Sequence, residues 1–285
     1  VMCLVADDQQ LIIGGRAGLT FLDGFQAEYD EAIRDPAFDY SFISAIDKTE
    51  SELWIAARGG IFKRTAGKRS WERIITKKDL VSQRIYSIAS GSDGNLMVAT
   101  ERNAYLYHSS GLRLQTLFPD GLDWPVFNIN YTHGKYYLST YYGLYIYDEA
   151  NLSFLGRINS YGDFLAPAAN SAIDPVYESV LQGEILWVST HRGLVQFQLV
   201  QEKGSAYLAP QTPFRPRGLA QVGKRVWVGT DLGLFSFEPT NASWRHYTVN
   251  DGLASNFVTD LVAIDNYIWL GTNLGLTRIV WRNLY

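Results

Sequence analysis

The feature that most constrains this chain is a short motif that recurs seven times. It consists of a run of bulky apolar residues, a pair of small residues, two variable residues and, in most copies, Gly followed by an apolar residue. The bulky runs and small pairs occupy residues 11–15, 53–57, 96–100, 136–140, 186–190, 226–230 and 268–272. An internal period of 20–50 residues is typical of solenoids, propellers and similar arrays. The repeat therefore has to be measured before any single element is assigned.

The turn residue that closes each motif gives the period. These residues are Gly18, Gly60, Asn103, Gly143, Gly193, Gly233 and Gly275, and they are 42, 43, 40, 50, 40 and 42 residues apart. A spacing of about 42 residues is the length of one four-stranded propeller blade. Asn is the residue that best tolerates a left-handed backbone after Gly, so Asn103 is expected to form the same tight turn. The sequence predicts an all-β, seven-bladed β-propeller of four-stranded antiparallel blades, with residues 1–285 forming a single domain.

Each part of the repeat has a physical explanation. Residues 261–264 are apolar without alternation, as expected for an inner strand that is covered on both faces. The small pair marks the place where neighbouring blades crowd together and a large side chain does not fit. One large residue per motif is predicted to fill the space between blades. These predicted core residues are Ile12, Trp54, Met97, Tyr137, Trp187, Trp227 and Trp269.

The two ends of the chain bear on the last blade. Residues 1–5 have the pattern of an inner strand, and residues 276–281 have the pattern of a third strand, after which four residues remain. A closed ring normally completes its last blade with a strand from the other terminus, because closure removes exposed sheet edges. We therefore expect the last blade to be incomplete within this chain. We also expect the chain to be a fragment of a larger ectodomain, in which a segment before Val1 or a neighbouring domain supplies the missing strand.

The motif with its flanking segments resembles a known family. Leu-Trp-Val/Leu-Gly-Thr-x-x-Gly-Leu is followed by an aromatic outer strand and by Asp-Gly-Leu-x-Ser-Asn-x-Val, as in residues 251–258. This combination resembles the two-component regulator propeller repeat. That repeat forms periplasmic sensor domains of hybrid two-component systems of Bacteroidetes. The resemblance spans the whole chain and is strongest in repeats six and seven.

Composition and motifs exclude several functions for this domain. The net charge is -4 and the isoelectric point is near 5.6, which argues against a domain that binds nucleic acid through its phosphates. No apolar run approaches the roughly 18 residues of a membrane span. The four histidines lie far apart without metal-ligand spacing, and neither a GxSxG elbow, a P-loop nor a CxxC pair is present. We therefore predict no catalytic residues, no metal site and no cofactor.

Two irregular stretches interrupt the repeat. The spacing of 50 between Gly143 and Gly193 reflects residues 159–170, which show no strand alternation. Insertions in repeat proteins go to loops on one face, which is often the binding face, although a passive surface loop fits the pattern equally well. Residues 210–216 carry three prolines and are expected to form an edge or a loop.

The predicted topology identifies one rim of the disc as a candidate binding surface. Strands that run up and down place the turn between the second and third strands on the same rim as the linker between blades. Arginine binds carboxylate or sulfate groups in bidentate fashion, and aromatic faces stack on sugar rings. We therefore predict that this rim binds an oligosaccharide, and an acidic one would match the arginines. The predicted ligand-binding residues are Arg16, Arg58, Arg102, Trp124, Tyr141, Tyr142, His191, Arg192, Asp231 and Asn273.

The resemblance implies a function for the intact protein. It implies an inner-membrane histidine kinase whose periplasmic ectodomain contains an adjacent propeller and an immunoglobulin-like domain, forms a homodimer, and controls polysaccharide-utilisation genes. This chain would be the carbohydrate sensor and not itself an enzyme. Two alternatives stay open: an extracytoplasmic propeller enzyme that cleaves glycans, and a structural propeller that holds protein partners. The enzyme is favoured if acidic residues such as Glu101 and Asp231 point into the central channel.

Overall fold

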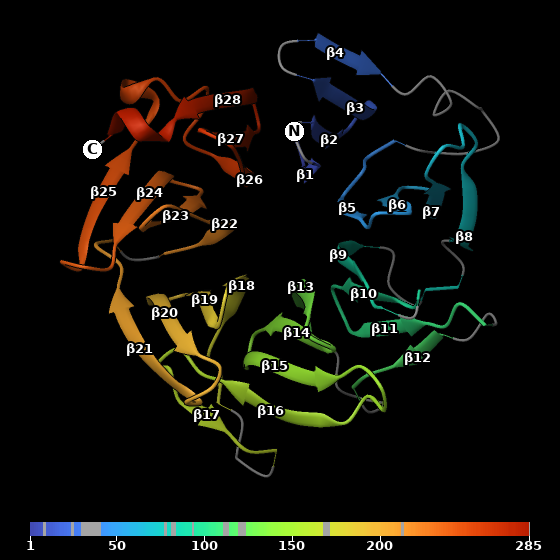
Figure 1. Cartoon of the computed structure of the whole chain (residues 1–285), viewed down its shortest axis with the longest axis horizontal. Helices are drawn as coiled ribbons and strands as arrows, with labels where there is room; N and C mark the ends of the chain where they lie inside the picture. The colour runs from blue at the N-terminus through green and yellow to red at the C-terminus, as the bar shows by residue number, and fades with distance from the viewer. Residues whose placement is uncertain are drawn as a thin grey trace.

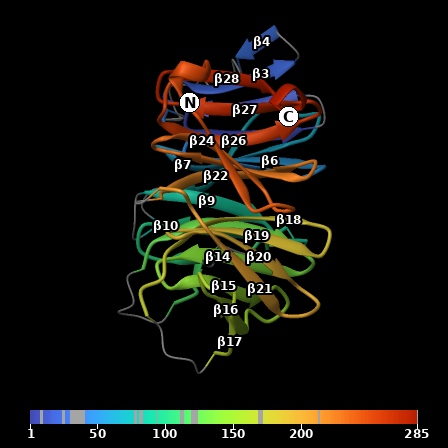
Figure 2. The ribbon, with the colours of Figure 1, turned by 90° about the vertical axis from the view of Figure 1, so that its left-hand side faces the viewer.

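The fold was obtained as a computed structural model. It describes residues 1–7, 10–23, 26–29, 41–76, 79–80, 84–92, 94–110, 114–118, 124–167, 172–211 and 214–284. Seven antiparallel sheets are arranged around a centre, as Figure 1 shows, and the view from the side shows the ring edge-on (Figure 2). The all-β, seven-bladed propeller predicted from the repeat is confirmed.

Consecutive strands form each of the first three blades. Blade 1 contains β1 (Cys3–Asp7), β2 (Gln10–Gly15), β3 (Gly18–Asp23) and β4 (Gln26–Tyr29). Blade 2 contains β5 (Ala45–Lys48), β6 (Glu52–Ala57), β7 (Gly60–Thr65) and β8 (Glu72–Thr76). Blade 3 contains β9 (Ile85–Ser90), β10 (Leu96–Thr100), β11 (Ala104–Tyr107) and β12 (Leu114–Thr116).

Blades 4 to 6 continue the pattern, with one addition. Blade 4 contains β13 (Val126–Thr132), β14 (Lys135–Thr140), β15 (Gly143–Asp148), β16 (Phe154–Ile158) and a short fifth strand, β17 (Phe164–Leu165). Blade 5 contains β18 (Val176–Gln182), β19 (Ile185–Thr190), β20 (Gly193–Gln198) and β21 (Lys203–Leu208). Blade 6 contains β22 (Pro216–Val222), β23 (Arg225–Thr230), β24 (Gly233–Glu238) and β25 (Ser243–Tyr247). Pro216 thus begins an inner strand, where its missing N–H is tolerated.

Blade 7 has three strands in the described part of the chain. They are β26 (Val258–Ile264), β27 (Tyr267–Thr272) and β28 (Gly275–Val280), and two 3-10 turns flank them, η2 (Val249–Asp251) and η3 (Trp281–Leu284). The expectation of an incomplete last blade is confirmed. The inner strand of blade 7 contacts β1 of blade 1. The Leu4 N–H donates to the Asp260 carboxylate at 2.7 Å. The ring is therefore closed by contact between inner strands.

The core consists of one apolar cluster between each pair of neighbouring blades. Six of the seven predicted fillers are at most 2% exposed. Trp269, between blades 7 and 1, is only partly buried, which corrects the prediction for that residue. The small pair acts as predicted: a Cβ at Gly14, Gly229 or Gly271 would lie 2.5–2.7 Å from a side chain of the neighbouring strand or blade.

The turn between the second and third strands has a second determinant that the sequence analysis missed. The Thr of the small pair donates to the carbonyl of the turn residue, as Thr140 does to Gly143 at 2.8 Å, and it accepts the N–H of Tyr142 at 3.0 Å. Asn103 is not left-handed, contrary to the expectation. Its side chain accepts the N–H groups of Ala104 (2.8 Å) and Phe118 (3.2 Å), so it stabilises the turn by hydrogen bonds.

Candidate functional site

A bulge near the start of the inner strand recurs in blades 3 to 7. In each of these strands one residue is skipped in the pairing with the second strand. A bulge of this kind leaves one residue unpaired and re-aims its side chain. All five bulged residues line the central channel, a cavity of about 1430 Å³ between the inner strands. They are Tyr86, Phe127, Tyr177, Arg217 and Thr259.

Three of the bulged residues are aromatic and adjacent. The ring of Phe127 lies 6.4 Å from that of Tyr86 and 5.5 Å from that of Tyr177, measured between centroids. Tyr141, from the turn between the second and third strands of blade 4, meets Phe127 edge-on at 4.9 Å. Burial is the main cause that raises the pKa of Tyr177, so its hydroxyl stays protonated. The result is a row of aromatic rings across blades 3 to 5.

Arginines surround this row at the same end of the channel. The Arg84 guanidinium lies 5.1 Å from the Tyr86 ring centroid. Arg215 is 3.8 Å from the Asp231 carboxylate and its side chain is 60% exposed. Arg217 lies over the Phe257 ring at 4.5 Å. We call this end of the channel, which comprises Arg84, Tyr86, Phe127, Tyr141, Tyr177, Arg215 and Arg217, the channel mouth.

One residue further along the inner strands, the channel becomes acidic. Asp260 accepts the backbone N–H groups of Leu4 and Leu261, each at 2.7 Å, yet burial raises its pKa to about 7. Glu178 has a pKa raised well above its usual value, first by burial and then by the negative charge of Asp260. The inner strand between them has Gly218, which carries no side chain, at the corresponding position. A cationic mouth thus leads to a pair of carboxyls that tend to hold a proton.

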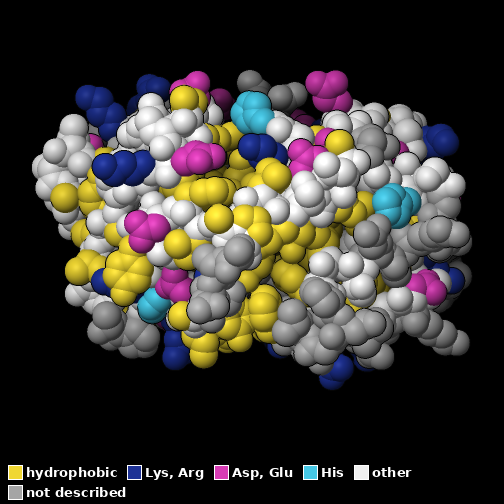
Figure 3. All heavy atoms as spheres, turned by 90° about the horizontal axis from the view of Figure 1, so that it is seen from below, with side chains coloured by type: hydrophobic (Ala, Val, Ile, Leu, Met, Phe, Trp, Pro, Cys, Tyr) yellow, Lys and Arg dark blue, Asp and Glu magenta, His cyan; other side chains and the backbone are white. Residues whose placement is uncertain are grey.

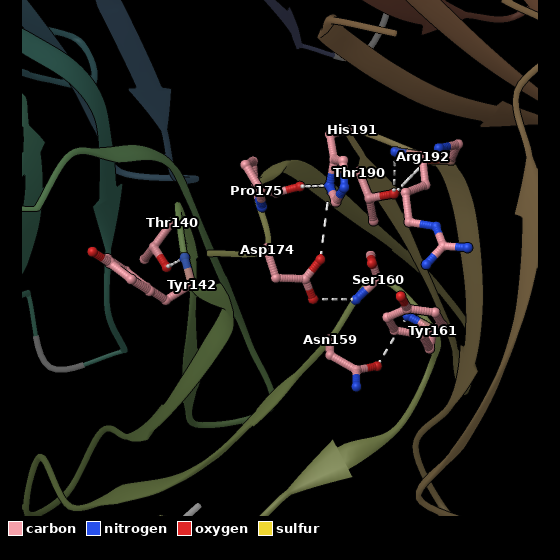
Figure 4. A network of polar contacts seen from close by, with 11 residues as sticks. Thr140, Tyr142, Asn159, Ser160, Tyr161, Asp174, Pro175, Thr190, His191 and Arg192 are labelled. Atoms are coloured by element: carbon pink, nitrogen blue, oxygen red, sulfur yellow. Dashed lines mark hydrogen bonds and ion pairs between the residues drawn. The ribbon is translucent and has the colours of Figure 1, made fainter. Parts of the chain in front are cut away.

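A second, smaller cavity lies on the same rim between blades 4 and 5. Its volume is about 260 Å³, and Figure 4 shows most of the side chains that surround it. We call it the side pocket. It is lined by Tyr142, Arg157, Asn159, Ser160, Tyr161, Leu165, Ala172, Ile173, Asp174, His191 and Arg192.

The insertion in blade 4 forms one wall of this pocket. The Asn159 side chain accepts the N–H groups of Tyr161 (3.0 Å) and Asp163 (2.8 Å). The Asp174 carboxylate accepts the Ser160 N–H at 2.7 Å and lies 3.7 Å from His191 Nδ1. The part of the insertion that the structure describes is therefore ordered by hydrogen bonds, and β17 within it pairs with β16.

The predicted ligand-binding residues divide into four groups. Tyr141 belongs to the channel mouth and Asp231 is paired with Arg215 beside it, whereas Tyr142, His191 and Arg192 line the side pocket. The ring centroid of Trp124 lies 4.3 Å from that of Tyr142, and Trp124 packs against the core between blades 3 and 4. Four predicted residues are exposed on other turns and line neither cavity: Arg16, Arg58, Arg102 and Asn273. Residues that the sequence placed at one rim site are therefore divided between two separate cavities, the core and exposed turns.

The sequence analysis missed most of the channel mouth. Phe127, Tyr177 and Arg217 each follow the first residue of an inner strand. Alignment of the repeats shows a large aromatic or charged residue at this position in blades 3 to 6, but it does not show that a bulge turns the side chain into the channel. Glu101 and Asp231, on which the enzyme alternative depended, do not line the channel, whereas Glu178 and Asp260 do.

The space-filling view shows the outer edge of the ring on the side of β16 and β17 (Figure 3). Hydrophobic side chains are spread over this edge among charged and polar ones. In the residues that the structure describes, no helix is long and apolar enough to cross a membrane. No group of three or more His, Cys, Asp and Glu side chains in the same residues could hold a metal ion.

The comparisons with known proteins agree on the fold. No protein-family model and no curated protein sequence matches the chain. Two structures of the extracellular domain of BT4673 from B. thetaiotaomicron, a one-component or hybrid two component system, match 98% of this chain with a TM-score of 0.75 and 20% and 19% identity. The match covers 38% of each of those chains. YCF48 bound to a D1 peptide matches 98% of this chain and 92% of its own, with a TM-score of 0.67 and 17% identity.

Proposed function

We propose that this chain is a sensor domain of an extracytoplasmic receptor of a two-component system, and that its channel mouth binds an acidic oligosaccharide. The observation that carries the proposal is the combination of an aromatic row with three arginines at one end of a wide channel. Aromatic faces stack on sugar rings, and guanidinium groups bind carboxylates or sulfates in bidentate fashion. The likeness in fold to extracellular domains of two-component systems supports the sensor role.

The signal would arise from a shift between two states of the receptor. A ligand changes such an equilibrium only as far as its affinity differs between the states. In the intact receptor, which we propose to be periplasmic and dimeric, an adjacent propeller and an immunoglobulin-like domain would pass the difference to a histidine kinase. The regulated genes would be those for use of the polysaccharide from which the ligand derives.

Calorimetric titration with fragments of polygalacturonate, and with neutral galactan fragments of the same length, tests the ligand class. We expect the acidic fragments to bind more tightly. Arg217→Ala should weaken their binding by about tenfold, since a charge-assisted hydrogen bond is lost. Arg69→Ala is the matched control, because Arg69 is an exposed arginine in the hairpin between the third and fourth strands, at the opposite rim. Equal binding of acidic and neutral fragments, or no effect of Arg217→Ala, would contradict the proposal.

A glycan-cleaving enzyme is the second candidate, and the carboxyls in the channel are the observation that favours it. A carboxyl whose pKa is raised by burial to about 7, as that of Asp260 is, is suited to general acid catalysis. Mass spectrometry of the titration mixtures decides between the two. Intact fragments support the sensor, whereas shortened fragments, absent with Asp260→Asn, would replace it by an enzyme.

A further inference from the structure

The side pocket contains a buried hydroxyl without a partner. Ser160 is 2% exposed and belongs to the lining of the pocket, yet its Oγ makes no hydrogen bond within the described residues. A buried polar atom left unsatisfied costs about 1–3 kcal/mol, so native structures rarely keep one without a reason. Because Ser160 lines a cavity, a ligand in that cavity is a candidate partner for its hydroxyl.

Positive charge predominates in the lining. The Arg, Lys, Asp and Glu side chains of the lining are Arg157, Arg192 and Asp174, an excess of one positive charge, and Arg157 donates to the Tyr142 carbonyl at 3.4 Å. The Asp174 carboxylate is already engaged by the Ser160 N–H and by His191. The pocket therefore favours an anion.

Arg192 is positioned to hold such an anion. Its guanidinium lies 4.0 Å from the centroid of the Tyr161 ring, and its backbone N–H donates to Thr190 Oγ1 at 3.1 Å. Within the described part of the chain it forms no salt bridge with a carboxylate. A guanidinium that lies against an aromatic ring can still bind a carboxylate through two parallel hydrogen bonds.

The wall that carries Ser160 is rigid without a ligand. Gly162 has φ of 89° and its O accepts the Gly204 N–H at 2.9 Å, so the insertion is fastened to β21 of blade 5. A Cβ on Gly162 would come within 2.8–2.9 Å of Gly204, so only glycine allows this approach. A preorganised wall lowers the entropy that binding costs.

From these contacts we propose that the side pocket binds a sugar acid of monosaccharide size through its carboxylate. The carboxylate receives hydrogen bonds from Arg192 and from the Ser160 hydroxyl, and the sugar ring lies against Tyr161. A cavity of 260 Å³ is slightly smaller than the range of about 300–1,000 Å³ typical of drug-sized ligands, which sets the size of the occupant. The proposal does not depend on ligand binding at the channel mouth.

The test uses D-glucuronate as the probe and D-glucose as its neutral counterpart, with binding followed by NMR titration of the protein. We expect glucuronate to bind and glucose to bind at least tenfold more weakly. Arg192→Gln should weaken glucuronate binding by about tenfold and Ser160→Ala by about three- to tenfold. Arg69→Ala, at the opposite rim, should leave it unchanged. Binding is read from the NMR signals of the residues that line the side pocket, so failure here is distinguishable from failure of the proposed function at the channel mouth.

A stability measurement separates the binding role of Ser160 from a structural one. Because its hydroxyl has no partner among the described residues, Ser160→Ala should leave the thermal midpoint of the unliganded protein unchanged or raise it. A lowered midpoint would assign the hydroxyl to the fold. Equal binding of glucuronate and glucose, or an unchanged affinity in Arg192→Gln, would overturn the proposal.

Discussion

The contact between blades 4 and 5 and the contact between blades 7 and 1 solve the same packing problem differently. At the first, nine buried apolar side chains form the cluster, and the filler Tyr137 is 2% exposed. At the second, three apolar side chains are buried in the described residues, and the filler Trp269 is partly exposed. The larger aromatic residue is thus the less buried one. Burial depends on the surrounding blade and not on the residue type alone.

Polar contacts replace apolar ones where the ring closes. The Leu4 N–H donates to Asp260, the Thr259 hydroxyl donates to the Val1 carbonyl at 3.2 Å, and the Val1 nitrogen donates to the Thr272 carbonyl at 3.1 Å. Each such bond contributes only about 0.5–1.5 kcal/mol net, less than a buried aromatic side chain. The contact between blades 7 and 1, which closes the ring, is therefore the weaker one. The contact between blades 4 and 5, beside which the side pocket lies, is densely packed.

The largest expected difference comes from truncation of the two fillers. Tyr137→Ala should lower the free energy of unfolding by about 3–5 kcal/mol, because it leaves a cavity in a closed cluster. Trp269→Ala should lower it by only about 1–2 kcal/mol, because part of its surface is already in water. Urea unfolding followed by circular dichroism measures both. Equal losses would show that the closing contact is as well packed as the other.

A glycine substitution tests the rigidity of the wall at the contact between blades 4 and 5. Gly162→Ala should cost about 2–3 kcal/mol and weaken glucuronate binding, since the new Cβ meets the Gly204 backbone and φ is positive. Gly67→Ala is the matched control: φ is 78° there and nothing lies within 4 Å, so its cost should be about 1 kcal/mol. A Gly162→Ala protein as stable as Gly67→Ala would mean that the insertion moves aside freely.

The repeat in the sequence was sufficient to predict the fold, but it was not sufficient to predict the candidate site. Blade number, strand order and the buried fillers follow from spacing and small residues, which act locally within each repeat. The channel mouth depends on bulges such as that at Phe127, and a bulge becomes visible only when the partner strand is known. The side pocket brings Ser160 of blade 4 and Arg192 of blade 5 together, and no local sequence pattern shows that residues of two different repeats lie side by side.

A pH series tests the role of Asp260 in ring closure. Because burial raises its pKa to about 7, folded Asp260 keeps a proton that the unfolded chain loses near its usual pKa of about 4. The folded state therefore binds more protons between these values, and the free energy of unfolding should fall as the pH rises from about 4 to 7 and then level off.

Glu178→Gln sharpens this measurement. It removes a second buried carboxyl whose pKa is raised, first by burial and then by the negative charge of Asp260, so the thermal midpoint should fall less between pH 5 and pH 8, by about 2–4 °C in comparison with the unchanged protein. Differential scanning calorimetry at the two pH values gives the difference. Identical falls in both proteins would show that Glu178 does not contribute to the pH dependence.

The smallest effect is expected from the hydrogen bond between Thr259 and Val1. Thr259→Val keeps the shape of the side chain and removes the hydroxyl that donates to the Val1 carbonyl, so it should cost about 0.5–1 kcal/mol. Combined with Trp269→Ala, its effect should be smaller than the sum of the two single effects if both residues hold β1 against blade 7, because residues that stabilise one contact are not additive. Strict additivity in urea unfolding would show that Trp269 acts within blade 7 alone, and that the polar contacts by themselves hold the ring closed.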